Sequence, residues 1–239
     1  MRLDRYLFEK KLAQSRNKAK ELIEEGCVKV NKKSIKKPSF EVDENDLIEV
    51  ENENFYVSRA AKKLENFLKE IDLDIKDKEI LDIGASTGGF TQILLNKGAK
   101  KIYALDVGKS QLHESLRNSE KIINIENQDI REYFVDKKFD IVTCDVSFIS
   151  VIKIIKDIDR LSKDNIIILF KPQFEVGKDV KRDKKGVVKD KKAIEKAIKK
   201  FEEETKKFGW KLIKKSESKI AGKEGNQEFF YYFKKVKNG

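Results

Sequence analysis

Two charged side chains stand directly after apolar stretches of this chain. Asp145 follows residues 139–144 and Lys171 follows residues 166–170, and both stretches have the length and apolar content of buried strands. In open α/β sheets, ligands bind at the carboxyl ends of the strands. A carboxylate and an amine at such an edge can orient a substrate and move a proton. We therefore expect Asp145 and Lys171 to share one site.

A glycine-rich turn marks a second chemical feature. Residues 80–83 form an apolar run that enters Gly84-Ala85-Ser86-Thr87-Gly88-Gly89 and then Phe90. Glycines let the backbone approach a ligand closely and adopt dihedral angles that a Cβ would forbid. Asp106 ends the next predicted strand, residues 101–105, where a carboxylate can accept hydrogen bonds from ribose hydroxyls. Turn and acid together predict a cofactor that contains adenosine, although such a turn can also merely join a strand to a helix.

The spacing of this turn argues against a dinucleotide. The dinucleotide motif needs a glycine where this chain has Ser86, and Asp82 brings a negative charge toward the place of a pyrophosphate. A cationic cofactor without phosphate, S-adenosylmethionine, fits better. We expect these residues to bind it: Asp82, Gly84, Ser86, Gly88, Phe90, Asp106, Asp129 and Asp145.

The first fifty residues form a separate pattern. Apolar residues at helical spacing predict two helices, with Ser15 as the cap of the second, and a hairpin follows at residues 28–33. From Ser15 through Val30 and on to residues 46–50, the order resembles the S-four RNA-binding domain. That resemblance implies RNA-backbone contacts at Arg16, Lys18, Lys20, Lys29, Lys32 and Lys33. A DNA-reading helix-turn-helix is the competing interpretation, and the hairpin after the helix pair favours RNA.

From Phe55 onward the chain resembles the TlyA family of ribosomal RNA 2′-O-methyltransferases, relatives of the FtsJ-type enzymes. Five separated motifs carry this resemblance: residues 56–64, the turn at 84–90, and residues 145–150, 171–178 and 225–230. The resemblance implies an α/β fold: a Rossmann-like, seven-stranded S-adenosylmethionine-dependent methyltransferase domain with a small N-terminal α+β domain of the S-four type. It also implies boundaries at residues 1–51 for the RNA-binding domain, 52–57 for a linker and 58–239 for the FtsJ-like domain.

The same resemblance implies a catalytic tetrad of Lys63, Asp145, Lys171 and Glu228. Lys171 is the expected base, because a nearby Lys63 and partial desolvation would lower the pKa of its amine toward the range needed to deprotonate a ribose hydroxyl. Asp145 and Glu228 would orient the two lysines. Lys62 remains an alternative to Lys63, and Arg59 is an expected RNA contact.

The composition of the chain limits the partners that it can bind and argues against a metal site and a membrane span. The chain has 239 residues and a net charge of +11, and the whole excess lies in residues 171–239, with 22 basic and 11 acidic residues. Such a charge predicts an acidic partner, nucleic acid or an anionic membrane, and the family resemblance implies ribosomal RNA or a ribosomal subunit. One histidine and two cysteines offer no metal site, and no apolar run of membrane-spanning length occurs. We expect a cytoplasmic monomer without a membrane partner.

The expected reaction is 2′-O-methylation of a ribosomal RNA ribose, a cytidine by resemblance. Large-subunit RNA is favoured, because the trimmed chain ends resemble members associated with that RNA alone. Ala60-Ala61 and Tyr56 depart from the usual glycine pair and tryptophan of the family, so the coupling of the linker to the active site stays open. Three other hypotheses remain: a small-molecule or protein methyltransferase, a non-catalytic RNA-binding protein and a membrane-active haemolysin-like protein.

Overall fold

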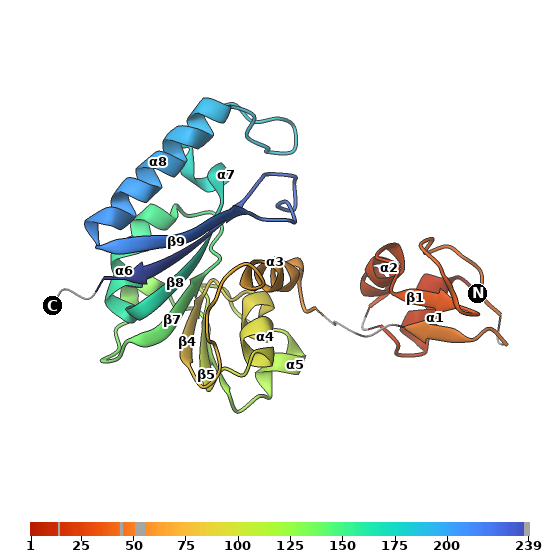
Figure 1. The fold of residues 1–239 in the computed structure, drawn as a ribbon. Helices are drawn as coiled ribbons and strands as arrows, with labels where there is room; N and C mark the ends of the chain where they lie inside the picture. Colours follow the sequence, from red (N-terminus) through yellow and green to blue (C-terminus); the bar gives the residue numbers. More distant parts are fainter. Residues whose placement is uncertain (14, 44, 51–55, 237–239) are drawn as a thin grey trace. The chain divides into compact units, whose positions relative to one another are not determined.

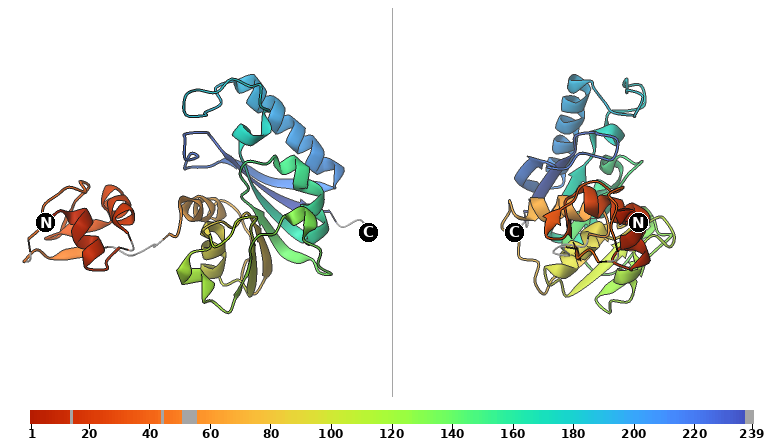
Figure 2. Two further views of the ribbon diagram at one scale, coloured as in Figure 1. Left: turned by 180° about the vertical axis from the view of Figure 1, so that it is seen from behind. Right: turned by 90° about the vertical axis from the view of Figure 1, so that its right-hand side faces the viewer.

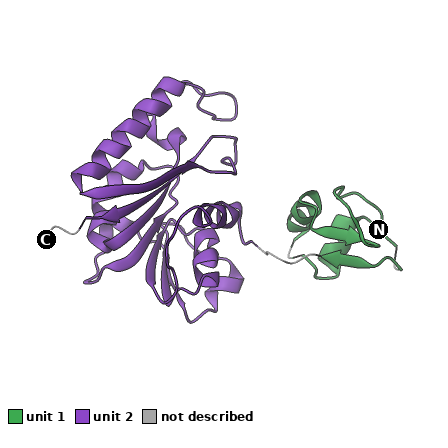
Figure 3. Cartoon of the chain, in the orientation of Figure 1, with its two compact units in different colours: residues 1–55 green, residues 56–239 purple. Residues whose placement is uncertain are grey.

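A computed structural model describes residues 1–13, 15–43, 45–50 and 56–236. The chain forms two compact units, residues 1–55 and residues 56–239 (Figure 3). The predicted linker, residues 52–57, lies outside the described residues except for Tyr56 and Val57. Both belong to the second unit: the Tyr56 hydroxyl donates to Glu65 Oε2 at 2.6 Å, and the Val57 amide donates to Gln92 Oε1 at 2.9 Å.

The first unit is a helix pair followed by a small sheet. Its helices are α1 (Leu3–Glu9) and α2 (Arg16–Glu24), and its strands β1 (Val28–Val30), β2 (Lys33–Ser34) and β3 (Ile48–Val50) pair antiparallel in the order β2-β1-β3. The Ser15 side chain accepts from the Lys18 amide at 3.1 Å, which confirms the predicted cap. Asn31 and Lys32 have positive φ at the hairpin turn. The predicted α+β unit with its hairpin is therefore confirmed.

The second unit is built on a seven-stranded sheet (Figure 1). Its strands are β4 (Glu79–Ile83), β5 (Lys101–Leu105), β6 (Ile122–Ile125), β7 (Phe139–Cys144), β8 (Ser162–Phe170), β9 (Trp210–Glu217) and β10 (Phe229–Lys235). They lie in the order β6-β5-β4-β7-β8-β10-β9, where β6 through β8 are parallel and β10 runs antiparallel to both neighbours. The predicted Rossmann-like sheet is confirmed.

Helices cover both faces of this sheet (Figures 1 and 2). The helical elements are α3 (Arg59–Leu68), α4 (Gly89–Asn96), α5 (Glu114–Arg117), α6 (Ile155–Leu161), α7 (Pro172–Glu175) and α8 (Lys191–Lys207), with short 3₁₀ turns η1 (Ile130–Glu132) and η2 (Val151–Ile154). Side chains alternate along a strand, so Ile166 and Ile168 of β8 face the α6 and α8 side while Ile167 and Leu169 face α3 and α4. This alternation leaves β8 buried on both faces.

Candidate active site

The carboxyl ends of β4, β5 and β7 surround a cavity of about 320 Å³. Its walls combine apolar side chains with a few polar groups, as is typical of cofactor sites. The lining residues include, from the sequence prediction, Gly84, Ser86, Asp106, Asp129 and Asp145, and beyond it Val107, Gln111, Gln128, Ile130, Ser147, Phe148 and Ile149.

Gly84 is a residue of the turn where a side chain cannot be accommodated. Its φ is +77°, and an added Cβ would lie 2.7 Å from the main-chain oxygen of Asp145. The turn therefore packs directly on the backbone that carries the candidate catalytic carboxylate. This close approach explains the glycine that opens the turn.

Asp106 organises the wall next to this turn. Its carboxylate accepts from the Ser86 amide at 2.8 Å and from the Gly108 amide at 2.7 Å. Asp129, which also lines the cavity, forms an ion pair with Arg131 at 2.6 Å, and hydrogen bonding from that guanidinium lowers the pKa of the Asp129 carboxyl. Two carboxylates thus border the cavity.

Asp82, Gly88 and Phe90 do not line the cavity, unlike the other predicted cofactor residues. The Asp82 side chain is fully buried in the sheet and accepts from Thr91 Oγ1 at 2.6 Å and from Thr143 Oγ1 at 2.8 Å. The prediction placed its charge at the cofactor, but both of its oxygens bind these threonines from α4 and β7. We assign Asp82 to holding α4 on the sheet beneath the turn.

Burial raises the pKa of Asp82 to about 6, and the nearby Asp145 charge adds to this effect while the two threonine hydroxyls oppose it. Because the folded chain holds this proton more tightly than the unfolded chain, the stabilisation is complete below pH 3.8 and is lost as the pH rises to about 6. The loss amounts to about 3 kcal/mol. Asp82→Asn removes this titration.

We expect the free energy of unfolding of Asp82→Asn, relative to the native chain, to rise by about 2 kcal/mol between pH 4 and pH 6.5. Urea titrations followed by the fluorescence of Trp210, the single tryptophan, report the second unit alone. A difference between the two chains that stays constant over this range would contradict the assignment.

The first candidate catalytic pair is Lys171 with Asp145. Lys171 Nζ lies 2.5 Å from Asp145 Oδ1 and also donates to Ser147 Oγ at 3.0 Å. Asp145 extends β7, since its amide donates to the Ile83 carbonyl at 2.9 Å, and its side chain reaches the cavity. The strands that the sequence predicted therefore bring both residues together at the edge of the cavity.

The second pair is Lys63 with Glu228. Lys63 Nζ donates to Glu228 Oε2 at 2.7 Å, and both residues are buried, with 8% and 2% of their surface exposed. Lys63 lies on the face of α3 that also buries Leu64 and Phe67. Of the two adjacent lysines, Lys63 is the one that the structure places against Glu228.

The register of β8 and β10 connects the two pairs. Phe170 and Phe229 are direct antiparallel partners, so Lys171 and Glu228, one residue beyond each, stand at the same edge of the sheet. Gln173 strengthens this connection, because its Nε2 donates to Glu228 Oε1 at 3.4 Å. The four predicted residues therefore come together from four elements.

Phe148 is a cavity residue to which the sequence motifs assigned no role. It is 92% exposed, has a φ of +65°, and its ring centroid lies 5.2 Å from that of Phe174. A non-glycine residue with positive φ is uncommon. Its position in the motif after Asp145 was visible in the sequence, but its exposure was not.

The predicted RNA contacts have differing surroundings. In the first unit, Arg16 pairs with Asp4 at 3.1 Å and Lys18 with Glu21 at 2.9 Å. Lys32 and Lys33 are exposed at the hairpin turn, and Lys20 and Lys29 are half-buried. In the second unit, Arg59 donates to the Ala221 carbonyl at 2.8 Å, which joins α3 to the loop before Glu228.

The described part of the chain contains no cluster of side chains that could hold a metal ion. Nor does any of its helices have the length and apolar content needed to cross a membrane. Cys144 is buried, and burial raises the pKa of its thiol.

Comparisons with known proteins identify the family of each unit. The FtsJ-like methyltransferase family matches residues 56–235, and the S4 domain family matches residues 1–48. The whole chain is 51% identical to the full length of the 23S rRNA (cytidine-2′-O)-methyltransferase TlyA of Campylobacter jejuni. It is 40% identical to Hemolysin A of Brachyspira hyodysenteriae, over 98% of this chain and 99% of that protein.

A solved structure described as a hemolysin from Streptococcus thermophilus has a TM-score of 0.73 and 31% identity, covering 99% of this chain and 89% of that one. The match extends through both units and includes the candidate site. The chain belongs to the TlyA family of FtsJ-like methyltransferases and carries an S4 domain ahead of the methyltransferase domain.

Proposed function

We propose that this protein transfers a methyl group from S-adenosylmethionine to the 2′-hydroxyl of a cytidine in large-subunit ribosomal RNA. The observation that carries the proposal is the Lys171–Asp145 ion pair at the edge of the cavity, with the buried Lys63–Glu228 pair beside it. The relative from Campylobacter jejuni, whose name specifies 23S rRNA and cytidine, supports the choice of substrate.

The cavity fits S-adenosylmethionine by the chemistry of its donors. Asp106 would accept from the ribose hydroxyls and Asp129 from the adenine amine, while Ile130 and Val107 offer apolar surface to the base. Gly84 contributes main chain without a side chain to the cavity wall. When bound, the cofactor would supply a methyl group on a positively charged sulfur, and Asp145 would offer a carboxylate to that charge.

Lys171 performs the proton transfer in this proposal. The ribose 2′-oxygen forms the new bond to the methyl carbon as the carbon–sulfur bond breaks, and the electron pair of that bond stays on sulfur. Lys171 first releases its ammonium proton to solvent, and the neutral amine, which Asp145 and Ser147 hold in place, then accepts the hydroxyl proton. Lys63, fixed by Glu228, supplies a second positive charge beside the developing alkoxide.

The direct test supplies isotope-labelled S-adenosylmethionine together with purified large or small ribosomal subunits. We expect the label in large-subunit RNA, and mass spectrometry of nuclease digests should locate it on the 2′-oxygen of one cytidine. Label in small-subunit RNA alone would overturn the choice of subunit. Label in protein or small molecules would overturn the RNA substrate, and no transfer to any fraction would support a non-catalytic role.

Phe148 provides a further test of how the site receives RNA. An exposed aromatic ring at the cavity can stack on the base of the target nucleotide, and such stacking contributes about 1–3 kcal/mol. We expect Phe148→Ala to raise the KM for RNA roughly tenfold or more. Phe134→Ala is the matched control, because Phe134 is also highly exposed, at 77%, and does not line the cavity. Equal KM values for the two variants would contradict this role.

A further inference from the structure

A short basic hairpin precedes α8, and the mechanism above does not use it. We define it as residues 181–189. Arg182 and Val188 pair as an isolated antiparallel bridge, the Asp183 amide donates to the Val187 carbonyl at 3.0 Å, and the Gly186 amide donates to the Asp183 carbonyl at 2.9 Å. Lys184 and Lys185 stand exposed at its turn. The hairpin is therefore an ordered element that presents two lysines.

Arg182 fastens this hairpin to the segment that follows Lys171. Its guanidinium donates to the Gln173 carbonyl at 3.1 Å and to the Gly177 carbonyl at 2.9 Å. These hydrogen bonds from Arg182 to main-chain oxygens hold the loop in one conformation. The start of the hairpin is therefore hydrogen-bonded to the backbone just beyond Lys171, the candidate general base.

Asn226 fastens the other side to the segment that precedes Glu228. The Asn226 side chain is buried, accepts from the Val188 amide at 3.0 Å and donates to the Gly186 carbonyl at 3.4 Å. Asn226 stands two residues before Glu228. The segment after Lys171 and the segment before Glu228 are thus both hydrogen-bonded to the basic hairpin.

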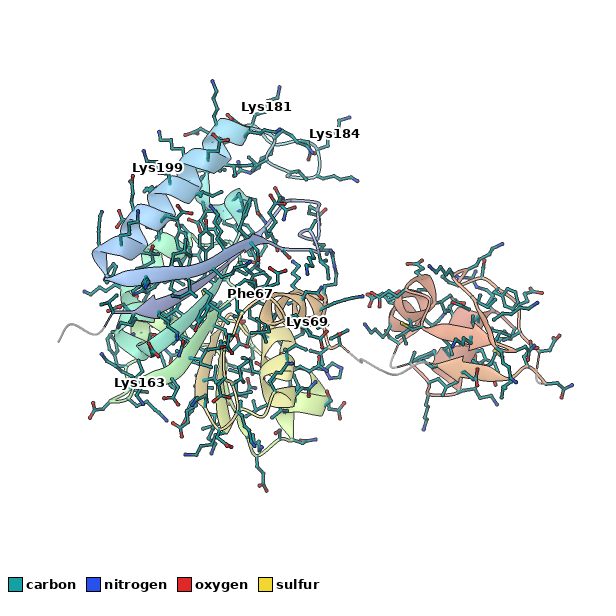
Figure 4. The ribbon with its side chains drawn as sticks, viewed as in Figure 1. Phe67, Lys69, Lys163, Lys181, Lys184 and Lys199 are labelled. Atoms are coloured by element: carbon teal, nitrogen blue, oxygen red, sulfur yellow. The ribbon has the colours of Figure 1, made fainter. Side chains whose placement is uncertain are left out.

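The positive charge of this region is not balanced by nearby acids. Residues 181–192 contain seven basic and two acidic side chains. Asp183 accepts from the Lys185 and Val187 amides, and among the described residues it forms an ion pair with Lys189 at 3.7 Å rather than with the lysines at the turn. Figure 4 shows Lys181 and Lys184 on the loop ahead of α8 and Lys199 farther along that helix.

Two lysines in the first turn of α8 add to this positive charge, and helix stability does not explain their position. Lys191 and Lys192 open the helix, and its first turn holds no acidic residue. Cations near a helix N-terminus oppose the helix dipole, at a cost of about 0.3–1 kcal/mol each. Asp190 caps this end of the helix, and Lys191 and Lys192 beside it add to the positive charge of the hairpin.

We propose that the basic hairpin binds the sugar-phosphate backbone of the substrate RNA beside the target ribose. This inference rests on the proposed function, and it adds a backbone contact within the methyltransferase domain to those expected of the S4 domain. Phosphate contacts position a nucleic acid without reading its sequence. Because the hairpin is anchored at Gln173 and Asn226, a phosphate held there places the ribose at a constant distance from Lys171 and Glu228.

The test compares two double variants with the same loss of charge. Lys184→Gln/Lys185→Gln neutralises the turn of the hairpin. Lys206→Gln/Lys211→Gln neutralises two exposed lysines near the far end of α8, about 25 Å away along a helix of 17 residues. For each variant we would measure the KM for ribosomal subunits, kcat at saturating RNA, cofactor affinity and unfolding temperature.

We expect the hairpin variant to raise the KM for RNA about tenfold. It should also reduce the slope of log affinity against log salt by roughly 0.7–0.9 for each phosphate that the hairpin no longer neutralises. Its kcat, cofactor affinity and unfolding temperature should match those of the control. No change in KM and salt slope, or equal changes in the two variants, would overturn the proposal. Weaker binding to anionic lipid vesicles with unchanged RNA affinity would also overturn it, in favour of a membrane partner.

Failure of the proposed function can be told apart from failure of this inference. If the native chain methylates no RNA, affinity for a labelled ribosomal RNA fragment still compares the two variants. Weaker binding by the hairpin variant alone would then support the backbone contact without the reaction. Methylation that proceeds with the same KM in all three proteins would retain the reaction and remove the hairpin from it.

Discussion

Lys171→Ala should abolish methyl transfer, with a loss of at least about a thousandfold in kcat, while the affinity for S-adenosylmethionine changes less than about threefold. The amine lies against Asp145 and Ser147 at the edge of the cavity, where it can accept the proton of a ribose hydroxyl. A positioned acid or base contributes about 10²–10⁴ in rate, and loss of the ammonium also removes stabilisation of the alkoxide. Because Lys171 is not among the cavity-lining residues, binding of the cofactor should persist.

Single-turnover methylation of RNA and equilibrium binding of S-adenosylhomocysteine measure the two effects separately. Lys171→Arg separates proton transfer from charge, since a guanidinium stays protonated and cannot act as a base. We expect this variant to be nearly as inactive as the alanine variant. Substantial activity in Lys171→Arg would assign Lys171 to electrostatic stabilisation, and near-native turnover in Lys171→Ala would remove it from the mechanism.

Lys63→Ala should both inactivate the enzyme and destabilise its second unit by about 3–5 kcal/mol. The reason is burial: removal of Lys63 leaves the Glu228 carboxylate, only 2% exposed, without its ion-pair partner. Lys62→Ala is the matched control, because it removes the adjacent and half-buried lysine of the same helix. We expect that variant to change stability by about 1 kcal/mol or less.

A third variant separates stability from activity. In Lys63→Met/Glu228→Gln both charges are absent, so no unpaired charge remains buried and most of the stability should return. Methyl transfer should stay absent, because the second positive charge at the alkoxide is missing. Urea unfolding followed by Trp210 fluorescence and labelled-methyl transfer provide the measurements. Recovery of activity in the double variant would show that the pair serves only the fold.

The residues at the ends of the parallel strands were predictable from the sequence. Residues 139–144 and 166–170 are apolar runs, and the structure places Asp145 and Lys171 directly after β7 and at the end of β8. Two physical rules are enough for this result: buried strands need apolar residues, and parallel strands end at a common edge. The five separated motifs then identified the family, which the comparisons confirm.

Other features depended on contacts between distant segments. Asp82 stands in the predicted glycine turn region, yet its carboxylate binds threonines 9 and 61 residues away and lies outside the cavity. Neither its direction nor its raised pKa follows from local sequence. The exposure of Phe148 and the anchoring of the basic hairpin by Asn226, 38 residues beyond Val188, likewise depend on tertiary packing. The domain boundaries and the catalytic roles stay predictions.

The sequence by itself determined the strands with Asp145 and Lys171 at their ends, the glycine turn and the uneven charge, because these follow from local periodicity and composition, and the family resemblance supplied Lys63 and Glu228. Only the tertiary structure decided which lysine of residues 62–63 meets Glu228 and how the two ion pairs come to one edge. The reason is the antiparallel register of β10 on β8, which places Glu228 beside Lys171 although they are far apart in the chain. Such a register depends on which face of each strand is buried in the sheet, and these faces are defined only once β8 and β10 pack together.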